Sequence, residues 1–385
     1  MLATMDFRLS SEQEAFRQTV RDFAEKVIGP RAEEMDESGE FPVDIVLQMG
    51  ELGLFGLPFP EVYGGAGADF TTLCVAIEEL ARVDSSMAIT LEAGVGLGAM
   101  PLYLFGTEEQ KQRWLVPLAR GEKIAGFGLT EPEAGSDSGN TKTTAELGQG
   151  EWVINGTKAF ITNVGTPISQ HVTITARTAP DEISNIIVPV DAPGFTAGRK
   201  YKKLGWHASD TRELVFADAR VPEENLLGAR GEGFKNFLII LDAGRVAIGA
   251  LAVGLAQGCV DMCVSYAKER KQFGKPIADF QAIAFKLADM SMSADLGRLA
   301  VYRAASLHDQ GLPFKVEASV AKLYASEAAV TAAREAIQIH GGYGFMDEFA
   351  VSRFYRDAKV LEIGEGSSEI QRLLIARDLG LPDAL

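Results

Sequence analysis

The sequence predicts an α+β protein with an N-terminal helical domain, a middle β-barrel or β-sandwich domain and a C-terminal four-helix bundle. Apolar residues recur at helical spacing through the first third of the chain. Short apolar runs bounded by Gly and Pro begin at about Ile124, and four long apolar segments follow Gly233. We therefore expect three domains, at residues 1–122, 123–231 and 232–385, which suits a chain of 385 residues.

The N-terminal region carries signals for helix starts and stops. Ser11-Glu12-Gln13-Glu14 has the pattern of a capping box, and the helical spacing that follows continues until Gly29-Pro30. Thr107-Glu108-Glu109-Gln110 is a second such box and opens a helix that reaches Pro117. Further helical patterns cover Ile45–Leu52 and Leu73–Val83, and a glycine-rich turn at 63–67 separates two helices.

The middle region reads as short strands. Asn155-Gly156 lies between two apolar runs and predicts a hairpin turn, because both residues tolerate positive φ. Pro and Gly fall between the other runs rather than within them. Those runs are His171–Arg177, Asn185–Val190 and Glu213–Phe216.

The last region returns to helices, and they are long. Ala, Gly and Ser are frequent in them, which allows helices to approach closely in a bundle. The segments are Val246–Lys268, Ala278–His308, Lys315–Gln338 and Ser368–Leu379.

Net charge and apolar runs argue against two kinds of partner. The formal net charge is −16, from 37 basic and 53 acidic residues, and such a surface repels nucleic acid and anionic lipid. The apolar run Val246–Val260 falls short of the roughly 20 residues of a membrane-spanning helix. We therefore expect neither a nucleic acid nor a membrane partner.

Cysteine and histidine usage points to a reducing compartment and no metal. The three cysteines do not form a disulfide framework, and Cys259 and Cys263 read as packing residues on one helix face. The four histidines lack metal-ligand spacing. Met1–Asp6 shows no signal-peptide pattern, so we expect a cytoplasmic protein.

Glu365 is the acidic residue with the most distinctive surroundings. It precedes Gly366 and the Ser367-Ser368 pair, and Gln371 completes a capping-box pattern with Ser368. A carboxylate there sits beside the free N–H groups of a helix N-terminus, where anions bind. The residues alone leave two interpretations open: a functional site, or a charge that only complements the helix dipole.

Five segments occur together in a specific order. They are Phe127–Asp137, Lys158–Asn163, Glu269–Gly274, Gln338–Gly344 and Ile363–Arg372. This ensemble resembles the acyl-CoA dehydrogenase family over essentially the whole chain. The resemblance implies FAD as cofactor, an acyl-CoA substrate oxidised to the trans-2-enoyl-CoA, and an electron transfer flavoprotein as electron acceptor. It also implies a homotetramer built as a dimer of dimers.

The resemblance assigns roles to individual residues. Glu365 corresponds to the base that removes the α-proton, while its backbone N–H and a flavin ribityl hydroxyl stabilise the enolate oxygen. Ser136, Asp242, Arg245 and Gly366 correspond to substrate-binding positions. Arg270 and Gln272 correspond to residues that reach FAD on a neighbouring subunit. The cofactor positions are Phe127, Leu129, Thr130, Gly135, Ser136, Phe160, Ile161, Thr162, Arg270, Gln272, Phe280, Gln281, Gln338, Ile339, Gly341, Gly342, Ser367 and Glu369.

Three positions decide between variants of this family. Some members carry the base in the segment that matches 241–245, but here that position is Gly244, which cannot act as a base. Phe160 replaces a common Trp beside the flavin. Gly364 replaces a Tyr found in many members, which predicts a wider acyl pocket beside Glu365.

Three other interpretations of the sequence compete with this one. An oxygen-reacting acyl-CoA oxidase or flavin monooxygenase would keep the same fold. A DNA-repair-associated relative would bind nucleic acid, but the charge argues against it. The glycines at 94–98 fit a loose dinucleotide fingerprint without the strand–turn–helix context it needs. The motifs do not specify the acyl chain length.

Overall fold

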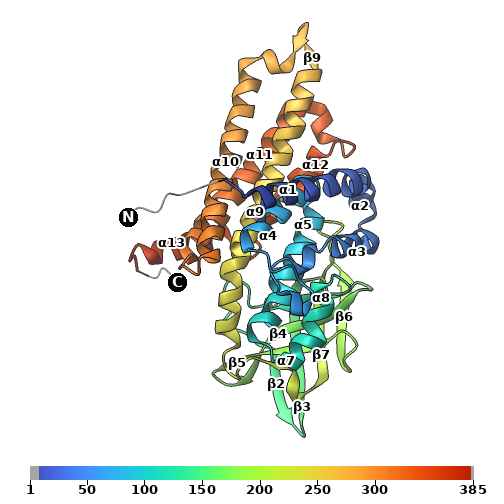
Figure 1. The fold of residues 1–385 in the computed structure, drawn as a ribbon, viewed down its shortest axis with the longest axis vertical. Helices are drawn as coiled ribbons and strands as arrows, with labels where there is room; N and C mark the ends of the chain where they lie inside the picture. The colour runs from blue at the N-terminus through green and yellow to red at the C-terminus, as the bar shows by residue number, and fades with distance from the viewer. Residues whose placement is uncertain (1–7, 383–385) are drawn as a thin grey trace.

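The computed structural model describes residues 8–382, so the Met1–Asp6 segment lies outside the described residues. Figure 1 shows helices in the upper part of the molecule and a β-sheet at the bottom. This is the α+β arrangement that the sequence predicts. The N-terminal helices are α1 (Ser11–Phe23), α2 (Ala32–Ser38), α3 (Val43–Glu51), α4 (Phe70–Ala81), α5 (Ser85–Glu92), α6 (Met100–Phe105), α7 (Glu108–Gln110) and α8 (Val116–Ala119).

Capping explains where two of these helices begin. The α1 capping box is formed by Ser10 and Gln13, one residue earlier than the sequence pattern suggested, because the Ser10 hydroxyl reaches the Gln13 N–H. Thr107 and Gln110 form the second predicted box, and helical turns continue from there to Ala119. Residues 93–99 form a π-helical segment after α5 rather than a phosphate-binding loop. The weak dinucleotide fingerprint therefore does not mark a Rossmann site.

The middle region forms one sheet in the order β6-β7-β3-β2-β4-β5-β8, with β1 paired in parallel to β4. Apart from Val190, the predicted strand segments lie within longer strands, and the strands Thr144–Gly148, Phe195–Lys200 and Leu226–Leu227 were not predicted. The strands are β1 (Ile124–Gly128), β2 (Thr144–Gly148), β3 (Glu151–Thr162), β4 (Ser169–Ala179), β5 (Glu182–Pro189), β6 (Phe195–Lys200), β7 (Thr211–Pro222) and β8 (Leu226–Leu227).

The predicted hairpin at Asn155-Gly156 is wrong. Both residues lie inside the continuous strand β3, where the pairing with β7 shifts register between Ile154 and Gly156. The Asn155 side chain exchanges hydrogen bonds with Asp218, which occupies positive φ on the bulged partner strand. The actual turn is Gln149-Gly150, where both residues have positive φ. The Asn-Gly pair marks a β-bulge instead.

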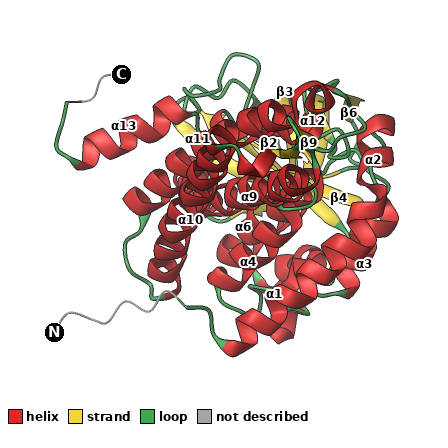
Figure 2. Cartoon of the chain, turned by 90° about the horizontal axis from the view of Figure 1, so that it is seen from above, coloured by secondary structure: helices red, strands yellow, loops and turns green. Residues whose placement is uncertain are grey.

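The C-terminal helices are centred on α9 (Gly233–Glu269), which packs against α4, α10 (Gln281–Asp309) and α11 (Lys315–His340). Figure 2 shows α9 surrounded by these helices, while α13 (Ser368–Asp378) projects to one side. Two further elements follow α9 and α11: the short hairpin β9 (Lys271–Gln272) and β10 (Lys275–Pro276), and α12 (Val351–Ala358).

Buried apolar side chains form two cores. One joins the N-terminal and C-terminal helices, from Val20 to Leu361, and the other lies within the sheet around Trp152. The helical regions at the two ends of the sequence therefore pack as one body.

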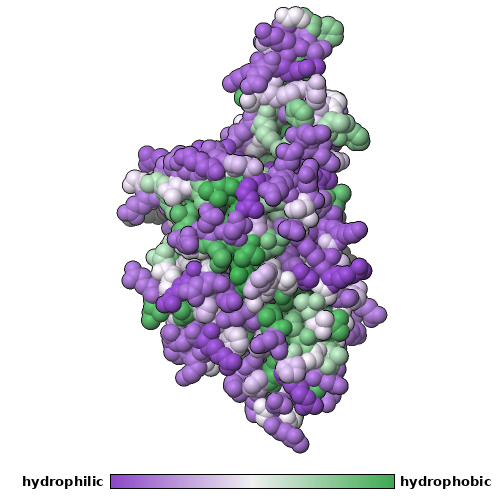
Figure 3. All heavy atoms as spheres, turned by 90° about the vertical axis from the view of Figure 1, so that its right-hand side faces the viewer, coloured by the Kyte–Doolittle hydropathy of each residue, from purple (hydrophilic) through white to green (hydrophobic). Residues whose placement is uncertain are grey.

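Two helical stretches, Ser85–Phe105 and Gly233–Glu269, are long and apolar enough to cross a membrane, yet 67% and 72% of their apolar windows are buried inside the protein. Both stretches are therefore mostly buried core helices, as the sequence predicted for Val246–Val260. Figure 3 shows one face of the molecule, where hydrophilic residues surround hydrophobic patches.

Candidate active site

Glu365 lies on the loop before α13, with a φ of 51°. Two side chains fix this loop through the Gly366 carbonyl: Lys322 Nζ donates to it at 2.8 Å and Gln371 Nε2 at 2.9 Å. Lys322 is fully buried on α11. The predicted capping box of Ser368 and Gln371 does not form, because α13 is capped without a side-chain bond and Gln371 turns back to the loop.

The Glu365 carboxyl group is buried, and burial raises its pKa. Hydrogen bonding with Glu92 and the positive charges of Lys322 and Arg245 oppose that rise. Apart from the Glu92 carboxyl, neither oxygen of Glu365 has a hydrogen-bond partner among the described residues. A carboxylate with this little solvation is a stronger base than one in water.

Two glycines shape the space around Glu365. A β carbon on Gly244 would overlap with Oε2 of Glu365, so α9 passes directly beside the carboxyl group. A β carbon on Gly364 would meet only the Val360 carbonyl, at 3.5 Å, so the space in front of residue 364 is open. Position 244, where the resemblance implies that some family members carry the base, thus adjoins the Glu365 carboxyl.

Asp242 and Arg245 lie one turn apart on α9 and form an ion pair of 2.5 Å. Burial raises the pKa of Asp242 and lowers that of Arg245. The Nε atom of Arg245 is buried without a hydrogen-bond partner among the described residues. The guanidinium therefore retains a free donor near Glu365.

A buried ion pair holds the loop that follows β1. Glu131 accepts hydrogen bonds from Lys158 Nζ at 2.7 Å and from the N–H groups of Lys142 and Thr143. Burial lowers the pKa of Lys158 to about 8. Burial also acts to raise the pKa of Glu131, but Lys158 and the hydrogen bonds from Thr143 and Lys142 together lower it. The pair anchors the segment that presents the predicted residues Leu129, Thr130, Gly135 and Ser136.

The end of β3 presents the second group of predicted flavin residues. Phe160 has a φ of 62°, is 67% exposed and lies 5.5 Å from the Tyr201 ring. Ile161 is buried in the sheet core, so only its backbone can reach a ligand. Thr162 ends the strand, and Phe127 on β1 packs against Phe237 on α9 at 5.0 Å.

A second cluster of predicted residues lies at the far end of α9. Arg270, Gln272, Ile339, Gly341 and Gly342 line a cavity of about 450 Å³. Phe280 and Gln281 begin α10 nearby, and Gln338 belongs to the last turn of α11, outside the cavity lining. Between Phe237 and Arg270, α9 rises roughly 50 Å at 1.5 Å per residue. The structure therefore does not bring the two clusters together within one chain.

Ser367 and Glu369 begin α13 beside Glu365, Ser367 at the cap and Glu369 exposed in the first turn. Sequence reasoning missed Glu92 and Lys322, which lie in none of the five segments. A glutamate within an apolar helical run was the only available signal for Glu92. A lysine among the small residues of 318–326 was the signal for Lys322.

Family models for the N-terminal, middle and C-terminal domains of acyl-CoA dehydrogenases match residues 10–122, 126–219 and 231–380. The chain belongs to the acyl-CoA dehydrogenase family. The probable acyl-CoA dehydrogenase YngJ of Bacillus subtilis (strain 168) is 53% identical over 380 residues, which cover 97% of this chain and 100% of that protein.

Solved structures agree with this assignment. The butyryl-CoA dehydrogenase of Megasphaera elsdenii has a TM-score of 0.95 at 42% identity, covering 97% of this chain and 100% of that one. A chain from work on the electron transferring flavoprotein of Acidaminococcus fermentans has the same TM-score and identity, covering 97% and 99%. The chain is thus an acyl-CoA dehydrogenase in fold and family.

Acyl-CoA dehydrogenases depend on FAD, and an acyl-CoA dehydrogenase of Bacillus anthracis complexed with FAD has a TM-score of 0.92 at 37% identity, covering 96% of this chain and 67% of that one. The residues of this acyl-CoA dehydrogenase fit the cofactor. The exposed Phe160 ring and the hydroxyls of Thr130 and Thr162 suit a flavin. An Arg270 guanidinium beside the open backbone of Gly341 and Gly342 suits a pyrophosphate.

Acidic, histidine and cysteine residues bear on metal binding and on disulfide formation. The described residues contain no group of three His, Cys, Asp or Glu positioned to hold a metal ion. Cys74, Cys259 and Cys263 are free and buried among apolar side chains.

Proposed function

We propose that this enzyme removes the α-proton of an acyl-CoA thioester with Glu365 while a hydride leaves the β carbon. The observation that supports this assignment most strongly is the buried Glu365 carboxyl beside Gly244. Its pKa is raised, and apart from the Glu92 carboxyl no described group donates a hydrogen bond to it. Bound FAD supplies the acceptor for the hydride.

The chain's own residues would stabilise the charge that develops on the thioester oxygen. The backbone N–H of Glu365 donates to no oxygen among the described residues and is available for the thioester carbonyl. An N–H aimed at a developing oxyanion lowers the barrier to α-proton removal. Arg245, with Asp242, would bind the CoA portion of the substrate, and Gly366 and Ser136 would contact the acyl thioester.

We infer that the FAD site is shared between two copies of the chain. The cluster at Phe127, Thr130, Ser136 and Thr162 would hold the flavin of one copy, and Arg270 of another copy would reach its pyrophosphate. The separation of roughly 50 Å along α9 supports this division, as no single cofactor molecule reaches that far.

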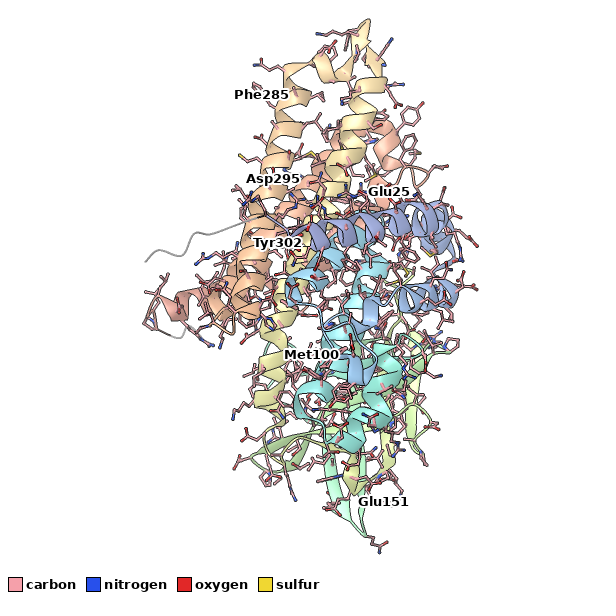
Figure 4. All side chains as sticks on the ribbon, viewed as in Figure 1. Glu25, Met100, Glu151, Phe285, Asp295 and Tyr302 are labelled. Carbon is pink, nitrogen blue, oxygen red and sulfur yellow. The ribbon has the colours of Figure 1, made fainter. Side chains whose placement is uncertain are left out.

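An exposed apolar stripe on α10 supports assembly into a homotetramer, a dimer of dimers. Its residues are 46–59% exposed, a large apolar surface for a single soluble chain. Figure 4 shows Phe285 on the outer side of α10, pointing away from the body. The stripe consists of Phe285, Met292, Leu296 and Leu299.

The electron acceptor we propose is an electron transfer flavoprotein, and the compartment is the cytoplasm. Structural similarity to the chain from the Acidaminococcus fermentans work supports this acceptor. The alternative of an oxygen-reacting enzyme is less well supported, because a similar oxidase structure is 34% identical whereas relatives named acyl-CoA dehydrogenases are 43–53% identical. If hydrogen peroxide formed in air at the rate of substrate oxidation, the enzyme would instead be an oxidase.

Anaerobic flavin bleaching tests the base assignment. The wild-type holoenzyme should bleach with saturated acyl-CoAs of varied chain length and branching. Glu365→Gln should keep yellow FAD and bind acyl-CoA, yet bleach on the order of 10³-fold more slowly, the typical loss when a general base is removed. Bleaching at the wild-type rate in this variant would refute the assignment.

A further inference from the structure

Glu92 ends α5 inside the helical body and lies in none of the motifs that point to the reaction. Its side chain is 1% exposed. Both carboxyl oxygens are buried and accept no hydrogen bond from an N–H group or a hydroxyl of the described residues. Burying a carboxylate without donors is costly, so such a group is expected to stay protonated or to serve a function.

The Glu92 carboxyl lies within hydrogen-bonding reach of the Glu365 carboxyl. Glycines leave room for the two carboxyl groups. A β carbon on Gly96 would lie 3.1 Å from Oε1 of Glu92, and a β carbon on Gly244 would overlap with Oε2 of Glu365. The charged groups that act on Glu365 are Lys322 from α11 and Arg245 from α9. Among residues 8–382, the charged group that acts on Glu92 is Glu365, and neither Lys322 nor Arg245 does.

The two carboxyl groups differ in their affinity for a proton. Burial and the negative charge of Glu365 raise the pKa of Glu92 well above its ordinary value. The pKa of Glu365 rises less, because the hydrogen bond from Glu92, Lys322 and Arg245 counteract burial. Two carboxyl groups this close cannot both ionise freely, so the proton resides on Glu92.

We propose that Glu92 is a positioning residue for the reaction: its protonated carboxyl donates a hydrogen bond to the Glu365 carboxylate and sets both its direction and its basicity. This inference rests on the proposed role of Glu365 as base. Glu92 keeps its proton throughout and does not touch the reacting atoms.

The step balances with this arrangement. The substrate Cα–H bond breaks, an O–H bond forms on Glu365, and the electron pair of the broken bond remains on the thioester as the enolate. Before this step the Glu92 and Glu365 carboxyl groups together hold one proton and one negative charge. After the step they hold two protons and are neutral. Lys322 and Arg245 remain to balance the enolate.

Two variants of Glu92 separate hydrogen bonding from simple packing. Glu92→Gln keeps the shape and an N–H donor, whereas Glu92→Leu keeps the volume and removes the donor. Loss of the donor raises the pKa of Glu365. The acid limb of the kcat/KM profile of the holoenzyme should therefore move upward by about one pH unit in Glu92→Leu and by much less in Glu92→Gln. An acid limb in Glu92→Leu that overlays that of the wild type, with only KM changed, would overturn the proposal.

Infrared spectroscopy of the holoenzyme at neutral pH tests the protonation state without using activity. The wild type should show a protonated-carboxyl C=O band that disappears in Glu92→Gln and persists in Glu365→Gln. Absence of that difference would also overturn the proposal, even if Glu92→Leu failed to fold. Wild-type bleaching in Glu365→Gln would instead refute the base assignment, while the infrared band would still report on Glu92.

Discussion

The α carbon of Gly244 and the Glu365 carboxyl share one small space: a side chain at position 244 would overlap with Oε2 of Glu365. The two chain positions at which acyl-CoA dehydrogenases are expected to carry the base therefore point to the same location. In this enzyme α9 has a glycine at that location, and the carboxylate comes from Glu365 on the loop before α13.

Gly244→Ala should displace the Glu365 carboxyl without unfolding α9, because alanine is favoured over glycine inside a helix. We expect kcat to fall on the order of 10- to 100-fold, since a small misplacement of a catalytic group is costly. Steady-state kinetics beside circular dichroism would measure this. Gly297→Ala, on α10, is the matched control and should keep full activity. Full activity in Gly244→Ala would show that the carboxyl position is not critical.

Gly364→Tyr should narrow the acyl pocket. The backbone tolerates a β carbon at residue 364, so the ring can enter the open space beside Glu365. We expect kcat/KM for long or branched acyl-CoAs to fall about tenfold relative to butyryl-CoA, the scale of discrimination by pocket shape. Gly364→Ala controls for the loss of glycine. An unchanged ratio, or a strict preference of the wild type for butyryl-CoA, would contradict the wide pocket.

Lys158→Met should destabilise the protein by about 3–5 kcal/mol, because it leaves the Glu131 carboxylate buried without its cation. The Glu131→Gln/Lys158→Met double variant should lose less than the sum of the single changes. Denaturant unfolding measures stability, and the flavin content of purified protein reports on the anchored loop. Lys268→Met, at an exposed position, should be neutral. Strict additivity would show that the two residues do not act as a pair.

Mixed oligomers test whether the cofactor site is shared. Arg270→Ala and Glu365→Gln should each be inactive alone. Co-expressed, they form hybrid pairs in which one of two sites carries neither change, so activity should return to about a quarter of the wild-type level. Mixing the purified variants without subunit exchange is the control. No recovery from co-expression would place both clusters in the site of one chain.

Asp357 links three parts of the fold and gives a pH-dependent contribution to stability. It accepts hydrogen bonds from Ser85 Oγ at 2.7 Å and from the Trp206 N–H at 2.6 Å. Burial raises its pKa to about 6, from an ordinary value of 3.8. Between these values the folded state holds a proton that the unfolded state has released, so its stabilising contribution is present below about pH 4 and lost as pH rises through 6.

Asp357→Asn should remove this dependence. The free energy of unfolding of the wild type should fall relative to the variant by about 3 kcal/mol between pH 4 and pH 7. Denaturant titrations across that range would measure the difference, with exposed Asp181→Asn as the control. A constant difference between wild type and variant would show that Asp357 does not titrate in this window.

Local patterns predicted the order of helical and β regions, because amphipathic spacing and capping boxes act over a few residues. They failed at Asn155-Gly156, where pairing with β7 overrides the turn preference and places the dipeptide in a bulge. They also placed the cap of α13 wrongly, since Gln371 turns to the Gly366 carbonyl.

By itself, the sequence determined the family, the three-part fold and the choice of Glu365 as the candidate base, because contiguous motifs encode them. The tertiary structure decided what surrounds that base. Glu92, Lys322 and Gly244 are distant from Glu365 in the chain and meet it only when α5, α9 and α11 pack together. The affinity of Glu365 for a proton depends on that packing, because burial and neighbouring charges act through space rather than along the sequence.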